Sequence, residues 1–373
     1  MRAVGIILAG GNNNRMKELT HKRAVAAMPI AGSYRSIDFA LSNMTNSHIQ
    51  KVAVLTQYNA RSLNEHLNSS KWWDFGRKQG GLYVFTPTIT NDNGYWYRGT
   101  ADAIYQNMDF LKKSHEPYVV IASGDAVYKM DYSKVLQYHI DKKADVTVVC
   151  KEMDPSDDVS RFGTIRMDDD MRITEFEEKP MVTKSNMIST GIYVIRRRLL
   201  IDLIEHAAEE ERFDFVNDVL IRYKNLKKIY GYKIDHYWSN IATVDAYYKT
   251  NMDFLKPEVR NYFFKQDPEI YSKVSDLPPA KYNPGASVKN SLVGSGSIIN
   301  GTVENSVIFK QVFVGNNCVI KNSIIMNDVY IGDNTVIENC IVESRDTIRA
   351  NTTYIGQPDD VKIVIEKNER YTL

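Results

Sequence analysis

A short glycine-rich loop follows the first apolar segment of the chain and ends in a cation. Residues 4–9 form an apolar run without polar alternation, and Gly10, Gly11 and Arg15 come after it. Such a run is typical of a buried parallel strand. A strand that leads into a glycine-rich loop is how α/β folds present backbone N–H groups to phosphates. The loop taken alone is also compatible with a tight turn, so other motifs must decide.

Length and composition indicate a globular protein with a large core. The chain has 373 residues, of which 43% are hydrophobic and 11% aromatic, and this length predicts about two domains. Its 47 Lys and Arg residues nearly balance 46 Asp and Glu residues, which argues against a general nucleic-acid or membrane-surface binder. Cys150, Cys318 and Cys340 lie far apart, which argues against a disulfide framework or zinc site. We expect a cytoplasmic protein with no nucleic-acid and no membrane partner.

Strand-like and helix-like segments alternate through the first two-thirds of the chain. This rhythm predicts a Rossmann-like α/β domain with a mostly parallel sheet and helices on both faces. The three aspartates at 168–170 are interpreted as a polar hairpin turn in preference to a metal cluster. The expected strands are 3–8, 51–56, 118–122, 145–150, 164–166, 188–195 and 228–233, and the expected helices are 35–47, 62–68, 100–114, 132–143 and 199–208.

The last third of the chain repeats. The pattern apolar-x-Asn-small-apolar-apolar begins at Val288, Val303, Ile320 and Ile337, so that successive copies are 15, 17 and 17 residues apart. A second six-residue pattern, which contains glycine, is interleaved with the first. Such a repeat predicts a β-helix with about three strands to a coil, in which every sixth side chain points inward. A β-sandwich of short strands is the alternative.

These patterns predict the domain organisation. We expect residues 1–255 to form the α/β domain, 256–285 to form a connecting segment that contains several prolines, and 286–373 to form the β-helix. Some β-helices of hexapeptide repeats catalyse acyl transfer with a histidine. No histidine follows His236, so we expect this β-helix to serve assembly.

Together these motifs resemble those of the bacterial ADP-glucose pyrophosphorylase (glucose-1-phosphate adenylyltransferase) family over nearly the whole chain. The resemblance implies a nucleotidyltransferase domain followed by a left-handed β-helix. It also implies a reaction of glucose 1-phosphate with ATP that gives ADP-glucose and pyrophosphate. The segments that carry the resemblance are 8–11, 34–43, 55–58, 96–107, 123–125, 128–132, 178–180 and 191–193.

The resemblance also implies which residues would bind the nucleotide phosphates, and two of these are altered. The loop of the active family reads Gly-Gly-x-Gly-x-Arg; this chain keeps Gly10, Gly11 and Arg15 but has Asn13 at the third glycine. The active family then has Arg-Ala-Lys-Pro-Ala, with the lysine on the phosphates. Val25 stands at that lysine, and valine offers neither a donor nor a charge.

The metal site implied by the resemblance is altered in the same way. Asp125 matches the first metal-binding aspartate of the family, whereas Asn240 stands where the second is expected. A neutral amide is a weaker ligand for Mg²⁺ than a carboxylate. Losing one preorganised contact typically costs about 10²–10³-fold in rate, so we expect Val25 and Asn240 together to cost roughly 10⁴-fold.

The sugar-phosphate side is better preserved. The residues that match the family there are Gly99, Thr100, Asp102, Lys179 and Gly191. The family's Asp-Phe-Gly-Lys-Asp run, in contrast, reads Asp-Phe-Val-Asn-Asp at 214–218.

We therefore interpret the chain as a regulatory subunit of the family (GlgD type) that is catalytically silent or very weakly active. It would require no cofactor itself, since Mg²⁺ would act in the catalytic partner. That partner would assemble with it into a hetero-oligomer, expected to be a tetramer, which could respond to sugar-phosphate or nucleotide effectors. Two alternatives stay open: an active adenylyltransferase in its own right, and a sugar-phosphate or nucleotide sensor without a catalytic partner.

Overall fold

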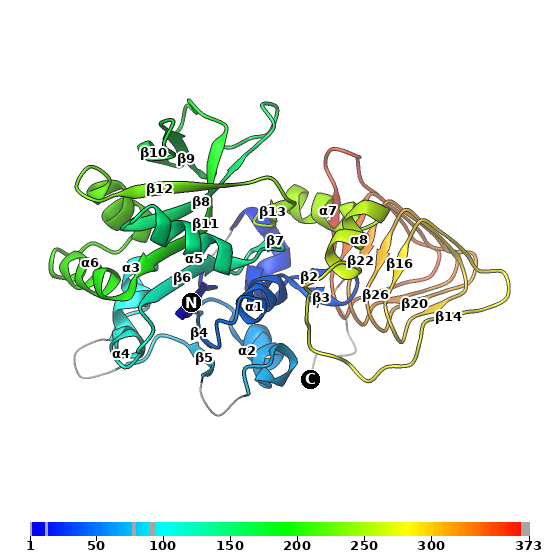
Figure 1. Cartoon of the computed structure of the whole chain (residues 1–373). Coiled ribbons are helices and arrows are strands. Elements are labelled where there is room, and N and C mark those ends of the chain that lie inside the picture. Colours follow the sequence, from blue (N-terminus) through cyan, green and yellow to red (C-terminus); the bar gives the residue numbers. More distant parts are fainter. Residues whose placement is uncertain (1, 12–13, 77–79, 90–93, 367–373) are drawn as a thin grey trace.

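The computed structural model describes residues 2–11, 14–76, 80–89 and 94–366. An α/β domain and a β-helix lie side by side, and helices α7 and α8 lie between them (Figure 1). Among the described residues, no helix combines the length and apolar character that crossing a membrane requires.

The α/β domain is built on a nine-stranded sheet of order β10-β9-β11-β6-β1-β4-β5, in which β8 pairs with β11 and β12. Strands β6, β1, β4 and β5 are parallel, as are β8 and β12. Strand β11 runs antiparallel to β6 and β8 and joins the two parallel groups. The strands are β1 (Ala3–Leu8), β4 (Lys51–Leu55), β5 (Gly81–Phe85), β6 (Tyr118–Ser123), β8 (Val146–Glu152), β9 (Gly163–Met167), β10 (Ile173–Glu178), β11 (Met187–Arg196) and β12 (Ile229–Ile234).

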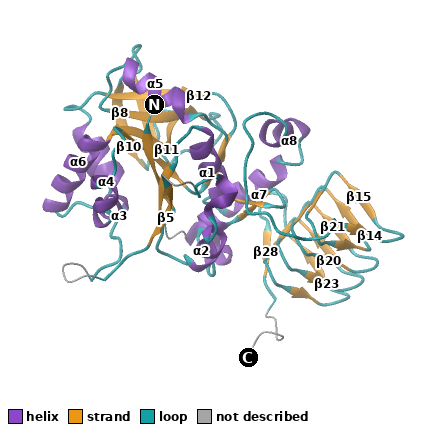
Figure 2. Cartoon of the chain, turned by 60° about the horizontal axis from the view of Figure 1, so that its bottom comes forward, coloured by secondary structure: helices purple, strands orange, loops and turns teal. Residues whose placement is uncertain are grey.

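Helices cover both faces of this sheet, which confirms the predicted α/β class (Figure 2). Because side chains alternate along a strand, Ile7 packs with α1, α2 and α5 in one apolar cluster, and Val4 and Ile6 pack with α3, α4 and α6 in another. The helices are α1 (Ser36–Asn46), α2 (Arg61–Leu67), α3 (Thr100–Gln106), α4 (Met108–Lys112), α5 (Tyr132–Asp141), α6 (Arg197–Glu209), α7 (Val244–Asp253) and α8 (Pro257–Phe264).

The predicted helix 100–114 is wrong in one respect, because it is broken at Asn107. This residue has φ −112° and ψ 23° and separates α3 from α4. Its side-chain amide donates to the carbonyl oxygen of Ala103 and to the hydroxyl of Tyr97, both at 2.9 Å. A side chain that binds the backbone in this way competes with helix continuation.

Shorter elements complete the α/β domain. The aspartates at 168–170 lie in the turn of the β9–β10 hairpin, as predicted, and the Asp168 carboxylate accepts hydrogen bonds from the N–H groups of Asp170 and Arg172. The remaining elements are β2 (Pro29–Ile30), β3 (Tyr34–Arg35), β7 (Ala126–Tyr128), β13 (Trp238–Asn240), the short 3-10 segments Asn14–Thr20, Val25–Ala27 and Ser70–Trp73, and the π-helix Phe215–Ile221.

The C-terminal domain is a left-handed β-helix whose three faces are parallel five-stranded sheets, so the β-sandwich alternative is wrong. Val303 pairs with Ile320, and Ile320 pairs with Ile337, in the predicted register. These three side chains are fully buried and stack inside the coil. The strands are β14 (Lys281–Tyr282), β17 (Ile298–Ile299), β20 (Phe313–Val314), β23 (Tyr330–Ile331) and β26 (Thr347–Ile348) on one face; β15 (Ser287–Lys289), β18 (Thr302–Glu304), β21 (Val319–Lys321), β24 (Val336–Glu338) and β27 (Thr353–Ile355) on the second; and β16 (Leu292–Val293), β19 (Val307–Ile308), β22 (Ile324–Ile325), β25 (Cys340–Val342) and β28 (Lys362–Val364) on the third.

The repeated Asn-small pair forms one corner of each coil. Asn305 and Asn322 have φ of 46° and 43°, a left-handed conformation that asparagine tolerates better than most residues. The hydroxyl of Ser306 accepts a hydrogen bond from the backbone N–H of Ser323 one coil away, at 3.1 Å. The corner is thus held by backbone conformation and by contacts between coils.

The segment between the domains contains helix α8, which was not predicted. Pro257 stands in the first turn of α8, where its missing N–H costs nothing. The ring of Phe263, which is fully buried, lies 5.4 Å from that of Phe39 and 5.2 Å from that of Phe254. The same apolar cluster includes Val307 and Ile324 of the β-helix. The two domains therefore share part of one core.

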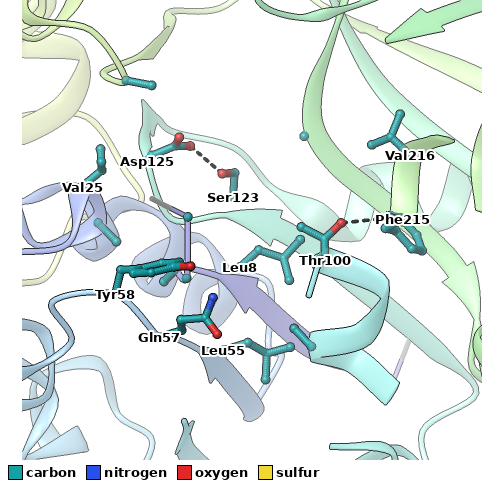
Figure 3. A pocket seen from close by; sticks show the side chains of 18 of the residues that line it. Leu8, Val25, Leu55, Gln57, Tyr58, Thr100, Ser123, Asp125, Phe215 and Val216 are labelled. Atoms are coloured by element: carbon teal, nitrogen blue, oxygen red, sulfur yellow. Dashed lines mark hydrogen bonds between the residues drawn. The ribbon is translucent and has the colours of Figure 1, made fainter. Parts of the chain in front are cut away.

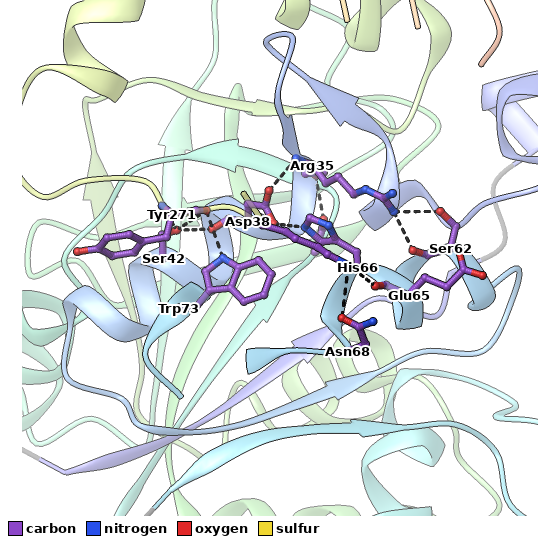
Figure 4. A network of polar contacts seen from close by, with 12 residues as sticks. Arg35, Asp38, Ser42, Ser62, Glu65, His66, Asn68, Trp73 and Tyr271 are labelled. Carbon is purple, nitrogen blue, oxygen red and sulfur yellow. Dashed lines mark hydrogen bonds and ion pairs between the residues drawn. The ribbon is translucent and has the colours of Figure 1, made fainter. Parts of the chain in front are cut away.

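The chain beyond α8 is fastened to α1 by hydrogen bonds (Figure 4). The hydroxyl of Ser42 accepts from the N–H of Tyr271 at 2.8 Å, and the indole N–H of Trp73 donates to the carbonyl of Tyr271 at 3.2 Å. Beside them the buried Asp38 carboxylate lies 2.6 Å from Nε2 of His66. Helix α1 thus contacts the sheet, the domain connection and α2 at once.

Candidate functional site

A cavity of about 770 Å³ opens at the carboxyl ends of the central parallel strands (Figure 3). Leu8, Leu55 and Ser123, which end β1, β4 and β6, all line it. Ligands of open α/β sheets bind at this edge. The cavity is therefore the candidate functional site.

Most of the residues singled out from the sequence meet around this cavity. Asp102 does not line it, and Asn13 lies outside the described residues. The predicted residues that line it are Gly10, Gly11, Arg15, Val25, Gly99, Thr100, Asp125, Lys179, Gly191 and Asn240.

Gly10 and Gly11 follow β1 and line the cavity. Among the described residues, no atom outside its chain neighbours lies within 4 Å of a Cβ added at Gly11. Arg15 follows in the 3-10 segment Asn14–Thr20 and also lines the cavity.

Val25 presents an apolar surface where the family resemblance implies a lysine. It begins the short segment Val25–Ala27 and is only 7% exposed. It belongs to an apolar cluster with Met16, Leu19 and Ile241. The local packing at this position therefore suits an aliphatic side chain.

Asp125 and Asn240 are brought together by the pairing of β7 with β13. Asn240 pairs with Ala126, and the N–H of Ile241 donates to the carbonyl of Asp125 at 2.9 Å. The side-chain oxygen of Asn240 accepts from the N–H of Ala242 at 3.0 Å, and the Asp125 carboxylate accepts from the Ser123 hydroxyl at 2.5 Å.

These residues do not fit the two-carboxylate Mg²⁺ site that the family resemblance implies. One carboxylate is present, and the amide oxygen of Asn240 already accepts a backbone hydrogen bond. Among the described residues, no group of three or more His, Cys, Asp or Glu side chains could hold a metal ion. A hard cation prefers several oxygen ligands, carboxylates foremost.

Asp102 has a structural role at the start of α3. Its buried carboxylate accepts from the N–H of Arg98 at 2.8 Å and from the Gln106 amide at 3.0 Å, and it pairs with the Arg98 guanidinium at 3.3 Å. Gly99 is needed beside it, since a Cβ there would lie 2.3 Å from the carbonyl oxygen of Phe213. Asp102 thus positions the loop without facing the cavity.

Thr100 begins α3 and Lys179 follows β10, and both line the cavity. The Thr100 hydroxyl accepts from the N–H of Phe215 at 2.9 Å and fixes the π-helix against α3. Lys179 has φ 48°, a strained value for a residue with a side chain. Its ammonium lies 3.1 Å from Glu178, and its N–H donates to the carbonyl of Phe162 at 3.2 Å. Burial raises the pKa of Glu178, and the charge of Lys179 partly opposes that shift.

Arg161 also lines the cavity and was missed from the sequence. Its guanidinium donates to the Thr243 hydroxyl at 3.2 Å and lies 4.7 Å from the centre of the Phe162 ring. Burial lowers the pKa of Arg161, while Asp158 and Asp125 oppose this shift. A single arginine in a loop before a short strand leaves no periodic signal. Its position next to Phe162 and Gly163, at the start of β9, was the available clue.

Comparisons with known proteins agree with this architecture. A family profile described as "Nucleotidyl transferase" matches residues 4–257, and one described as "GlmU-like, C-terminal hexapeptide" matches residues 278–362. The fold and the profiles together place the chain in the nucleotidyl transferase family, with a C-terminal hexapeptide domain.

Several relatives are similar over most of the chain. The glucose-1-phosphate adenylyltransferase of Clostridium botulinum (strain Alaska E43 / Type E3) is 44% identical over 370 residues, which cover 98% of this chain and 95% of the relative. That of Pseudothermotoga lettingae is 42% identical over 364 residues, 97% and 86% of the two chains. That of Clostridium novyi (strain NT) is 41% identical over 320 residues, 85% and 84%. The chain belongs to the glucose-1-phosphate adenylyltransferase family.

Proposed function

We propose that this chain is a non-catalytic regulatory subunit of glucose-1-phosphate adenylyltransferase, which modulates a catalytic partner in glycogen synthesis. The observation that supports this most is the aliphatic Val25 in the cavity wall, where the active family carries a lysine. That side chain packs with Leu19 and Ile241. The cavity therefore has no ammonium group at the position that would neutralise the transferring phosphates.

Asn240 supports the same proposal independently. Phosphoryl transfer depends on positioning and charge neutralisation, and Mg²⁺ would supply much of that charge in the catalytic partner. In this chain the amide oxygen of Asn240 binds the N–H of Ala242. The scaffold of the site is kept, while two groups that act on the phosphates are absent.

An active adenylyltransferase is the alternative function, and one observation favours it. The relatives that match 85–98% of this chain bear the name of the enzyme. Activity in the purified chain separates the two. We expect ADP-glucose formation from glucose 1-phosphate and ATP, with Mg²⁺, to be about 10⁴-fold slower than that of a catalytic relative. Turnover within about tenfold of that relative, a difference of ~1.4 kcal/mol in barrier, would overturn the proposal.

The proposed assembly has a separate test. The β-helix exposes the ends of a solenoid, which require capping or packing, and its outer surface carries the stacked pair Phe313 and Tyr330, with ring centres 4.8 Å apart. Co-expression with a catalytic subunit, followed by native mass spectrometry, should show mixed oligomers. Two separate populations of homo-oligomers would contradict this part of the proposal.

A further inference from the structure

The mismatch between this cavity and a divalent metal changes what the cavity can bind. We propose that it binds a phosphorylated ligand, a nucleotide or a sugar phosphate, directly through cationic side chains and without a divalent cation, with Arg161 as the central contact. This inference rests on the proposed non-catalytic function, because a site without turnover has no need of a metal to activate the phosphate.

The charged residues around the cavity are mostly cations. Arg15, Arg98, Arg161 and Lys179 line it, against the single carboxylate of Asp125. Two of these cations pair with a carboxylate that does not line the cavity: Arg98 with Asp102 at 3.3 Å and Lys179 with Glu178 at 3.1 Å. Arg15 and Arg161 line the cavity with them. This set suits a ligand that carries two or more negative charges.

Arg161 lies where it can offset the charge of Asp125. Its charge interacts with that of Asp158, which does not line the cavity, and with those of Arg15 and Asp125, which do. A guanidinium is permanently charged and matches phosphate oxygens with two parallel N–H groups. Arg161 therefore supplies positive charge that offsets the Asp125 carboxylate, as a bound metal ion would otherwise do.

Arg161 is also held in place before any ligand arrives. The Thr243 hydroxyl fixes one end of the guanidinium, and the Phe162 ring supports its face. The carbonyl of Phe162 accepts the N–H of Lys179, so the two cations belong to one connected unit. Prior ordering of this kind lowers the entropic cost of binding.

The room available agrees with such a ligand. A cavity of about 770 Å³ lies within the ~300–1,000 Å³ typical of small-molecule sites. Val25 contributes an apolar surface to the cavity, so the phosphate contacts must come from the cationic side chains. The cations come from three segments: Arg15 from the 3-10 segment after β1, Arg161 from the turn before β9, and Lys179 from just after β10.

Calorimetry on the full chain tests the inference. ATP, ADP-glucose and glucose 1-phosphate are titrated separately, once with Mg²⁺ and once with EDTA. We expect at least one of them to bind with the same affinity in both buffers. The three arms identify whether the nucleotide or the sugar phosphate is recognised. Binding that disappears in EDTA, or no binding of any of the three, would overturn the inference.

Variants connect binding to Arg161. Arg161→Gln should weaken the ligand by about 10–100-fold, the loss expected for charge-assisted hydrogen bonds, and Arg161→Lys should recover part of it. Arg166→Gln is the matched control, since Arg166 is an exposed arginine on β9 that pairs with Glu175 at 3.6 Å and does not line the cavity. Thermal unfolding of each variant checks that it is folded. An unchanged affinity in folded Arg161→Gln would contradict the assignment.

The inference and the proposed function can fail separately. Rapid ADP-glucose synthesis by the wild-type chain would remove the regulatory proposal, whatever the binding results. Metal-dependent binding without turnover would leave the regulatory proposal standing and remove only this inference.

Discussion

Arg23 of the α/β domain forms an ion pair with Glu343 of the β-helix, with Nη2 and Oε1 2.5 Å apart. The two side chains are only 12% and 10% exposed. The second guanidinium nitrogen donates to the Ser344 hydroxyl at 3.3 Å. This contact lies at the junction that also buries Phe263 and Val307.

Breaking this pair should destabilise the protein strongly, because it leaves one charge buried without its partner. We expect Glu343→Gln to lower the free energy of unfolding by about 3 kcal/mol, measured by urea denaturation. Glu304→Gln is the control, because Glu304 lies 3.9 Å from Lys321 in a more exposed pair; such surface pairs contribute about 0–1 kcal/mol. Equal losses in the two variants would show that the junction pair contributes little.

Replacing Val25 and Asn240 with the residues of the active family should restore catalytic activity. We expect Val25→Lys combined with Asn240→Asp to raise ADP-glucose synthesis by at least about 10²-fold, the typical value of one recovered transition-state contact. Val25→Lys alone should also lower stability, since Val25 packs in an apolar cluster. The measurement is a coupled assay of pyrophosphate release with Mg²⁺.

Asn317→Asp is the control for the added charge, because Asn317 is exposed at a corner of the β-helix. It should leave activity at the wild-type level. If the double variant gained nothing while remaining folded, Val25 and Asn240 would not be the cause of the expected inactivity.

The buried His139 should make stability depend on pH. Its Nδ1 lies 2.9 Å from the Thr147 hydroxyl, and its buried Nε2 has no hydrogen-bond partner among the described residues. Burial lowers the pKa of His139 to about 4. In the unfolded chain, where its pKa is about 6.5, His139 binds a proton more readily. Stability should therefore be lost as pH falls from about 6.5 to about 4, by up to about 3 kcal/mol.

Comparison with a variant isolates this effect from the carboxylates that titrate in the same range. The difference in unfolding free energy between wild type and His139→Gln should shrink as pH falls through this window. His115→Gln, at an exposed histidine, should show a constant difference. A constant difference for His139→Gln as well would contradict the prediction.

The left-handed corners of the β-helix should reject β-branched residues. Asn322 has φ 43°, so Asn322→Val should cost about 1–2 kcal/mol in strain, and Asn322→Gly should cost about 1 kcal/mol less than the valine. Lys321→Val, one residue earlier on strand β21, should stay within about 0.5 kcal/mol of wild type. Chemical denaturation of the three variants makes the comparison, and equal costs for valine and glycine at position 322 would rule out backbone strain.

Local patterns predicted the central architecture well. The strand Ala3–Leu8 was predicted without error, because a continuous apolar run marks a strand buried on both faces. The β-helix registers followed from the spacing of Val303, Ile320 and Ile337. The first signal lies within six residues, and the second repeats every 17 residues, so both can be recognised in the sequence without the fold.

Features that depend on long-range contacts were not predicted. The short strands β7 and β13 are stable only because they pair across more than a hundred residues. Helix α8 depends on its aromatic packing against Phe39 of α1. The break at Asn107 is local in contrast, and it was missed because its side-chain hydrogen bonds to Ala103 and Tyr97 leave no pattern in the sequence. For the candidate site, the positions of the motifs indicated most of the lining residues. Arg161 belongs to no motif, and only the fold shows that it lines the same cavity as Asp125.

The shared apolar cluster at the junction also determines how the protein can be divided. Val307, Ile324 and Ile341 on one face of the β-helix pack with Phe39, Phe254 and Phe263 of the other domain and the connection. Cutting the chain after α8 would expose both halves of this cluster to water. The two domains should therefore melt in a single calorimetric transition, and neither should behave as a module that can be transplanted without its neighbour.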